Sequence, residues 1–335
     1  MYKYHSCLTL ILGVHMNLKV QKRKLSVILL FSLIFSLSIT YIQAYPLSEP
    51  IIADHSIANM VRLNQVPDSA IIDAKNTLHI AYQHTSHGSQ IIDGMNALPA
   101  FKEANGGTID LFDYNSTFLH DGAMSSVADV GYPGWDNATR DYLDNPVNSD
   151  CNVIMWSWCG QASSQTEQSM IDHYLDPMNL LESEYPNVMF VYMTGHTDGS
   201  GLEGNLHLRN EQIRDFCIAS DKILFDFADI ESYDPDGNYF GDKYVNDNCD
   251  WNNGTHSGNW ALDWQASHTQ DVDWFSCSCA HSQALNGNMK AYAIWWLWAK
   301  LGGWEITISE SLISLPFIIL VLCSLSVVVI LNKRK

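Results

Sequence analysis

Basic residues are scarce in this chain of 335 residues, which has 18 Lys and Arg against 37 Asp and Glu. Eight of the basic residues but only two of the acidic ones lie outside residues 45–304, so the formal charge of that part is near −25. Such a surface repels nucleic acid and anionic lipid, which excludes them as general partners. It suits solubility in a salty or cation-rich exterior and does not by itself identify a ligand.

Internal repeats and low-complexity linkers are also absent, so nothing in the sequence indicates a solenoid or a string of modules. The stretch 45–304 is long enough to bury one large core. We therefore expect a single domain over 45–304, flanked by segments of other character.

The first 44 residues have the pattern of a signal peptide. "KVQKRK" precedes the apolar run Leu25–Thr40, and "YIQA" follows it and ends at the small residue Ala44. This order of basic, apolar and cleavage regions is typical of export. The fifteen residues before Met16 fit neither region, so Met16 is a candidate for the true start.

Residues 305–335 contain a second apolar run, Leu312–Leu331, followed by "NKRK". Twenty mostly apolar residues are enough to span a bilayer, and the basic tail favours a cytoplasmic C-terminus. A processed sorting segment is the alternative, although the motif "LPxTG" is missing. Either way, the sequence predicts a domain on the outer face of the cell, anchored at its C-terminus.

Six cysteines lie between the two terminal segments, an even number that suggests disulfides in an exported protein. They are Cys151, Cys159, Cys217, Cys249, Cys277 and Cys279. We expect Cys249 to pair with Cys277 or Cys279, because these flank one polar insertion. Three sequons for N-glycosylation begin at Asn115, Asn137 and Asn253.

Strand-like and helix-like runs alternate along the domain. The predicted strands are Leu78–Gln83, Asn152–Trp158, Asn187–Met193 and Lys222–Ala228, and the predicted helices include Ser89–Phe101, Asp136–Leu143, Asn210–Ala219 and Asn288–Leu301. Ser164 and Glu167 form an S-x-x-E capping box ahead of a further helix to about residue 184. This alternation predicts an α/β fold with a parallel sheet and helices on both faces.

Polar clusters follow three of these strands. "HTSHGSQ" (84–90) follows the first, "CGQ" (159–161) the second and "TGHTDG" (194–199) the third. Ligands of such sheets bind beyond the carboxyl ends of the strands, so we expect the clusters to meet in one site.

The order of these motifs resembles that of the SGNH (GDSL-like) hydrolases over residues 77–301. "HTS" stands where that family has "GDS", which makes Ser86 the nucleophile, with Ser89 as the alternative or as the cap of the next helix. "GYPGWDNATRDYL" corresponds to the glycine block, with Gly134 the better match and Gly131 the alternative. "CGQ" corresponds to the asparagine block and places Gln161 there, and "CAHSQALNG" supplies the histidine, His281.

The resemblance implies a three-layer, flavodoxin-like fold and a serine esterase. His281 would take the proton of Ser86, and the Ser86 and Gly134 N–H groups and the Gln161 amide would stabilise the oxyanion. The family has Asp three residues before this histidine, whereas this chain has Ser278. Asp273 is the substitute we assign, with Asp271 as the alternative, so the site is a dyad or a rearranged triad. The expected substrates are acyl esters of carbohydrates or small molecules, and no cofactor is needed.

Two other functional hypotheses involve the same polar clusters at the carboxyl ends of the predicted strands. His84, His87, His196, Asp198 and His281 supply ligands suited to Zn²⁺ or Mn²⁺, as in a metal-dependent hydrolase. A glycan-binding surface protein without catalysis is the third hypothesis.

For that third hypothesis, aromatic rings near the proposed site would form a sugar platform: Trp158, with Trp135 and Trp156 as neighbours. Two acidic loops, Asp234–Asn238 and Asp247–Gly254, are candidates for structural Ca²⁺, but neither has a complete twelve-residue pattern.

Overall fold

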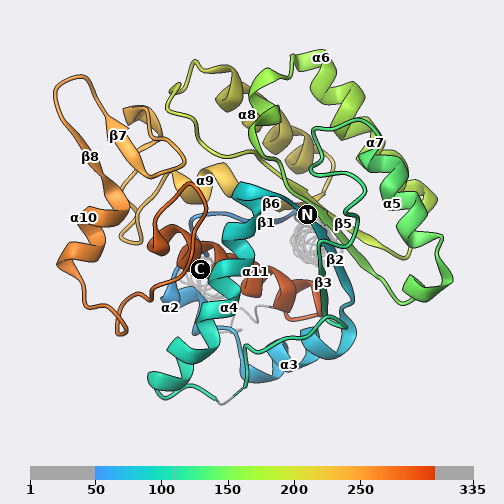
Figure 1. The fold of residues 1–335 in the computed structure, drawn as a ribbon, viewed down its shortest axis with the longest axis horizontal. Coiled ribbons are helices and arrows are strands. Elements are labelled where there is room, and N and C mark those ends of the chain that lie inside the picture. Colours follow the sequence, from blue (N-terminus) through green and yellow to red (C-terminus); the bar gives the residue numbers. More distant parts are fainter. Residues whose placement is uncertain (1–49, 109, 306–335) are drawn as a thin grey trace, which may run out of the picture. The chain divides into compact units, whose positions relative to one another are not determined.

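The computed structural model describes residues 50–108 and 110–305. Six parallel strands form one sheet in the order β1-β6-β5-β4-β2-β3 (Figure 1). The strands are β1 (Ile51–Ala53), β2 (Ile80–Gln83), β3 (Leu119–Asp121), β4 (Val153–Trp156), β5 (Met189–Met193) and β6 (Ile223–Phe225). The predicted α/β class with a parallel sheet is therefore confirmed.

Helices cover both faces of this sheet, which makes three layers (Figure 1). One layer contains α2 (Met60–Leu63), α3 (Asp68–Thr77), α4 (Ser89–Ala104) and α11 (Ala284–Leu301). The other contains α5 (Trp135–Leu143), α6 (Glu167–Met170), α7 (Asp176–Glu184) and α8 (Asn205–Ala219). Both faces of the central strands are thus shielded from water, which explains their continuous apolar runs.

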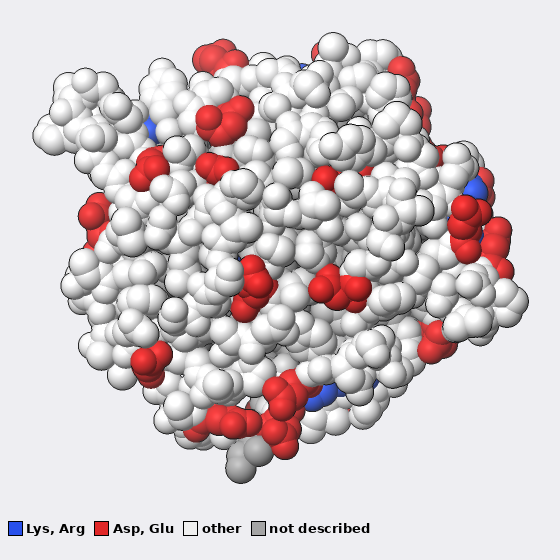
Figure 2. Space-filling view, in the orientation of Figure 1, with Lys and Arg blue, Asp and Glu red and all other residues white. Residues whose placement is uncertain are grey.

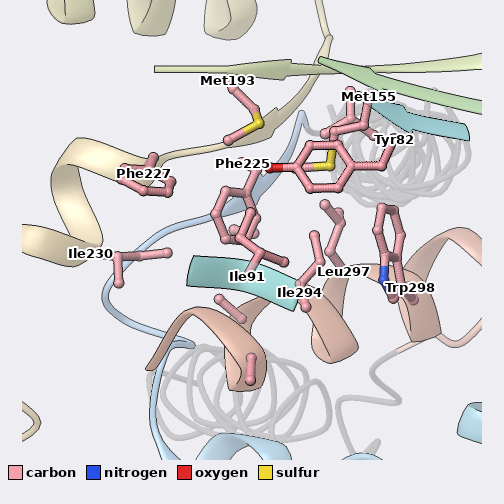
Figure 3. Packing of buried hydrophobic residues seen from close by; sticks show 14 of the residues in the cluster. Tyr82, Ile91, Met155, Met193, Phe225, Phe227, Ile230, Ile294, Leu297 and Trp298 are labelled. Carbon is pink, nitrogen blue, oxygen red and sulfur yellow. The ribbon is translucent and has the colours of Figure 1, made fainter. Parts of the chain in front are cut away.

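The core lies between the sheet and α11. Every residue from Leu285 to Ala299 is buried, because α11 contacts α4, α3 and α2 as well as the sheet. Tyr82 and Met155 of the sheet face Ile294 and Leu297 of α11 (Figure 3). Full burial of one such side chain contributes about 1.5–3 kcal/mol, so this layer stabilises much of the fold.

Two helix starts differ from the sequence predictions. The capping box ahead of α6 is made by Thr166 and Ser169 rather than by Ser164 and Glu167, since the Thr166 side chain accepts from the Ser169 N–H and the Ser169 hydroxyl accepts from the Thr166 N–H. Ser89 is the first residue of α4 and not its cap. Its hydroxyl instead donates to the Ser86 carbonyl at 2.8 Å.

An insertion follows β6 and extends the carboxyl edge of the sheet. It contains α9 (Phe227–Glu231), the antiparallel hairpin β7 (Asp250–Asn252) and β8 (Ser257–Asn259), and α10 (Trp260–Ser267). Acidic side chains are scattered over the face shown in Figure 2, and few basic ones accompany them.

The predicted signal peptide and nearly all of the C-terminal segment lie outside the described residues. Within 50–305 no helix is both long and apolar enough to cross a bilayer. The six cysteines of the described domain are free thiols, and their pairing stays a prediction.

The strand order places a topological switch point between β2 and β4. Leaving out β1, the strands run second, first, third, fourth, fifth from β3 to β6, which is the flavodoxin-like order. The chain leaves β2 toward β3 on one side and then returns to β4 on the other. The loops after β2 and β4 therefore diverge at the carboxyl ends of the strands, which is where ligands of such sheets bind.

Candidate active site

Three histidines from three distant loops stack at this switch point. The His87 ring lies parallel to the His196 ring, with centroids 4.0 Å apart and planes 3° apart. His281 covers the other face of His87 at 4.5 Å and 17°. We call His87, His196 and His281 the imidazole stack. The polar clusters after β2 and β5 thus meet, together with the loop before α11.

His87, the middle ring, also joins an acid to a thiol. Its Nε2 lies 2.9 Å from Asp247 Oδ2, and its Nδ1 lies 3.5 Å from Cys159 Sγ. An ionised carboxylate only accepts hydrogen bonds, so His87 carries its proton on Nε2 when neutral. Nδ1 then has a free lone pair directed at the thiol. Cysteine, histidine and aspartate are arranged as a nucleophile, a base and a group that orients the base.

Burial and the neighbouring groups favour the neutral form of His87. Burial lowers the pKa of His87 below 6.5 and outweighs the hydrogen bond to Asp247, which raises it, while His196 lowers it further. Burial raises the pKa of Asp247, but the His87 hydrogen bond and the nearby imidazoles outweigh this effect and leave that pKa below its ordinary value. At neutral pH the pair is therefore a carboxylate beside an uncharged imidazole.

The loop after β2 is folded so that neighbouring side chains diverge. Residues 86–88 form one 3-10 turn, in which Ser86 is exposed and has a φ of +30°, whereas His87 is buried. Gly88 permits this turn, because a Cβ there would lie 2.4 Å from both His84 Cβ and Ser157 Oγ. The turn thus directs His87 toward Cys159 in the loop after β4.

Asp129 connects this loop to the loop after β4. Its carboxylate accepts from the Thr85 N–H at 2.9 Å, from the Thr85 hydroxyl and from Gln161 Nε2 at 3.3 Å. Gln161 Oε1 in turn accepts from the Cys159 N–H at 3.0 Å. Asp129 is 1% exposed, so this bridge is a buried part of the site.

Of the two candidate glycines, Gly131 is the one that lies against Gln161. A Cβ on Gly131 would lie 2.2 Å from Gln161 Cβ, so no larger residue fits without displacing the amide. Gly134 instead caps α5 with a φ of +89°, and its missing Cβ would meet nothing within 4 Å.

A buried ion pair lies beneath the imidazole stack. Lys290 Nζ of α11 lies 2.7 Å from Glu231 Oε1 of α9, and both side chains are 0% exposed. Lys290 also donates to Gln90 Oε1, and its ammonium lies 3.6 Å from the Phe227 ring centroid. The pair is thus tied to α4, three residues after His87.

The same network reaches the other two imidazoles through the backbone. Glu231 Oε2 accepts from the Thr197 N–H at 2.8 Å, next to His196. Gln90 Nε2 donates to the Ala280 carbonyl at 2.5 Å, next to His281. One ion pair therefore supports the backbone beside all three stacked rings.

The remaining sequence-predicted polar residues have partners outside the imidazole stack. His84 turns toward β3, where its Nε2 meets Asp121 Oδ1 at 2.7 Å. Asp198 is exposed and accepts from Ser200 in a local turn, and Asp273 accepts from the Thr269 N–H at 2.9 Å. Among the described residues no hydrogen bond joins Asp273 to His281, and none joins Ser86 Oγ to a base.

The tryptophans proposed as a sugar platform belong to the core. Trp158 is 3% exposed and packs edge-to-face on Tyr174 at 4.9 Å. Trp135 and Trp156 are equally buried and contact each other. The expectation that these rings contact a glycan is corrected, because no face of them is open to a ligand.

A metal ion would need the imidazole stack to rearrange. Ligand atoms of His87, Asp247 and His281 all lie within 4.8 Å of one another. However, an imidazole lone pair lies in the plane of its ring, and two stacked parallel planes do not meet at one ion. The carboxylate of Asp234, in the other candidate Ca²⁺ loop, accepts the Asp236 and Asn238 N–H groups of its own turn.

Sequence reasoning missed Asp247 and the role of Cys159. In the sequence, Asp247 belongs to a candidate Ca²⁺ loop and Cys159 is among the disulfide candidates. The sequence signal for Cys159 was its place directly after a buried strand. Asp247 is 160 positions from His87 and had no local signal that pointed to a histidine.

No protein-family model matches the chain, and neither does a curated protein or a solved structure. The SGNH resemblance therefore stays a prediction from the motifs alone.

Proposed function

We propose that this chain is an exported acyl hydrolase that forms a covalent thioester on Cys159. The observation that carries the proposal is the chain of contacts from Asp247 through His87 to the Cys159 thiol. Its place at the switch point of the sheet supports it, because that is where ligands of such folds bind. The proposal keeps the predicted hydrolase class and gives the covalent step to a different side chain.

The reaction runs in two halves. His87 Nδ1 takes the Cys159 proton, and the thiolate attacks the acyl carbonyl to form a C–S bond. The C–O bond then breaks, and His87 returns the proton to the leaving alcohol. In the second half a water gives its proton to His87 and attacks the thioester, which releases the acid and restores the thiol. Asp247 keeps His87 in the required tautomer throughout.

Gln161 is the donor we assign to the oxyanion. Its amide nitrogen has two hydrogens, and Asp129 accepts only one of them. A donor of this kind is worth about 3–4 kcal/mol of barrier. Gly131 supports the assignment, since the backbone approaches the Gln161 side chain only where no Cβ intervenes.

A second candidate keeps Ser86 as nucleophile and His281 as base, with the class of serine esterase unchanged. The observation that favours it is backbone strain, because both residues have positive φ, +30° and +65°. Both are also exposed, Ser86 next to His87 in the sequence and His281 as one ring of the stack. Strained residues cluster at functional sites. Hydrogen bonds of a catalytic site also tighten when substrate binds, so the lack of one here does not exclude the pair.

The substrate class we propose is an acyl ester of a carbohydrate or small molecule met outside the cell. The support is the export pattern of residues 1–44, the anchor pattern of 305–335 and the acidity of the domain, which disfavours polyanions. The membrane would then be a partner only through the C-terminal segment.

A labelling experiment tests the nucleophile. The full chain is treated with iodoacetamide and, separately, with a fluorophosphonate, beside Cys159→Ala, Ser86→Ala and the surface control Ser149→Ala. We expect Cys159 to be the thiol that iodoacetamide labels fastest. Hydrolysis of aryl acetates should survive chelator, and activity should be lost in Cys159→Ala but kept in Ser86→Ala. Fluorophosphonate labelling at Ser86 would support the second candidate. Activity lost to chelator would instead favour the metal-dependent hydrolase.

A further inference from the structure

A polar cavity of about 120 Å³ lies beside the imidazole stack. His196 forms part of its wall, so the cavity begins one ring away from His87. Its other walls come from α8 and from the segments 197–201, 228–233 and 239–245, and they include Asp198, Glu211, Arg214, Tyr233 and Tyr239. The cavity is smaller than a whole-ligand pocket of about 300–1,000 Å³, so it suits one unit of a larger substrate.

The lining groups have hydrogen-bonding capacity left over. Arg214 has five N–H donors, and three are directed at Asp226 and Glu211. The Tyr233 and Tyr239 hydroxyls have no partner among residues 50–305. Burial raises the pKa of both tyrosines, so each phenol keeps its proton and remains a donor.

The charges of the cavity exclude ionic occupants. An anion would meet the carboxylates of Glu211 and Asp229. The Arg214 guanidinium is already neutralised by Asp226 and Glu211, each at 2.5 Å. Three carboxylates line the cavity. Glu211 faces Arg214 and Asp229 faces His55, while Asp198 is exposed and accepts from Ser200, so no buried carboxylate is left for a cation. A neutral group that both donates and accepts hydrogen bonds fits this balance.

An apolar occupant is disfavoured as well. It would separate the Arg214 and tyrosine donors from water without replacing their hydrogen bonds, which is unfavourable for each donor that becomes buried. Aromatic rings nevertheless provide flat apolar area, since Tyr233 and Tyr239 lie 4.9 Å apart at the wall. A carbon skeleton that carries several hydroxyl groups can satisfy the polar donors and also pack against the aromatic rings.

We propose that this cavity is the subsite for a hydroxyl-bearing unit of the substrate, namely a short polyol or a single sugar ring. The inference rests on the proposed function, because it places the alcohol side of the ester next to the stack. It commits the substrate class to polyol or sugar esters rather than alkyl esters.

Binding is measured first, without reference to activity. Saturation-transfer NMR on the full chain uses glycerol and methyl β-glucopyranoside as probes, with butan-1-ol and acetate as contrasts. We expect transfer to the two polyols and not to the contrasts. Tyr239→Phe and Glu211→Gln should weaken polyol binding at least five-fold, while the control Tyr132→Phe, an exposed tyrosine of another cavity, leaves it unchanged. Equal binding of butan-1-ol, or no effect of either variant, would overturn the subsite.

Kinetics then separate this inference from the proposed function. For glyceryl monoacetate, Tyr239→Phe should raise KM several-fold and leave kcat unchanged, with no change for butyl acetate. Polyol binding that depends on Tyr239, in a chain that hydrolyses no ester, supports the subsite and contradicts the proposed function. Hydrolysis with the same KM in Tyr239→Phe supports the proposed function and contradicts the subsite.

Discussion

Asp247 accepts a hydrogen bond from His87 at 2.9 Å, although 160 positions separate the two residues in the sequence. The contact joins the β7–β8 insertion to the loop after β2. It fixes which imidazole nitrogen carries a proton and leaves the other for the Cys159 thiol. The proposed chemistry depends on this one bond more than on any other.

Replacing Asp247 tests that dependence through pH. In the wild type kcat/KM should fall only as the pH drops through a pKa below 6.5, because burial lowers the pKa of His87 and only its neutral form accepts a proton. Asp247→Asn should reduce the rate about 100-fold or more. It should also move the acid limb to lower pH, since Asp247 raises the pKa of His87. The matched control is Asp273→Asn, the acid partner predicted from the sequence, which should change neither quantity. If only Asp273→Asn reduced kcat/KM, Asp273 and not Asp247 would be the acid partner of the catalytic histidine.

The two glycines of the "GYPG" segment give opposite expectations. Gly131→Ala should reduce kcat/KM at least ten-fold, because its Cβ would lie 2.2 Å from Gln161 Cβ and displace the amide that contacts Cys159. Gly134→Ala should cost about 1–2 kcal/mol of stability, from its φ of +89°, with catalysis intact. Steady-state kinetics and urea unfolding of both variants measure these effects on catalysis and stability. If Gly134→Ala were stable and inactive, the original match would be correct.

The Lys290–Glu231 pair should be costly to break from one side. Glu231→Gln leaves a buried ammonium without its carboxylate, and we expect a loss of about 3–5 kcal/mol in the free energy of unfolding. The double variant Glu231→Gln/Lys290→Met should lose less than the sum of the two single variants. Urea titration measures all three. Single variants within 1 kcal/mol of the wild type would show that the pair does not support the site.

Substitution of Trp158 tests whether this residue packs in the core or contacts a sugar. Trp158→Phe should lower the free energy of unfolding by about 1–2 kcal/mol and leave KM for sugar esters unchanged, because its ring is buried and its Nε1 has no partner among residues 50–305. Trp135→Phe is the matched comparison and should lose more, since its Nε1 donates to the His173 carbonyl at 2.9 Å. A raised KM in Trp158→Phe at unchanged stability would restore the platform.

The fold was predictable because segments that are buried on both sides are continuous apolar runs in the sequence. The apolar runs around Val153–Trp156 and Met189–Met193 reflect helices on both faces of the sheet. The run 291–299 of α11 is apolar because every residue in it is buried. Strands β1 and β3 were missed, since three residues at the sheet edge are too short to show a pattern.

The site was predictable only to the level of its loops. Sequence order placed "HTSHGSQ", "CGQ" and "TGHTDG" at one sheet edge, but it does not show which side chain of a tight turn points inward. Ser86 and His87 are adjacent, and yet one is exposed and the other buried. Asp247 comes from an insertion whose position depends on tertiary packing, so no local pattern identified it.

The most direct test of the central claim is the rate of Cys159 alkylation in the full chain, which is followed by mass spectrometry. With His87 as its base, Cys159 should react with iodoacetamide faster than the five other thiols of residues 50–305, and His87→Ala should slow it at least ten-fold. Equal reactivity of Cys159 in the wild type and in His87→Ala would contradict the account.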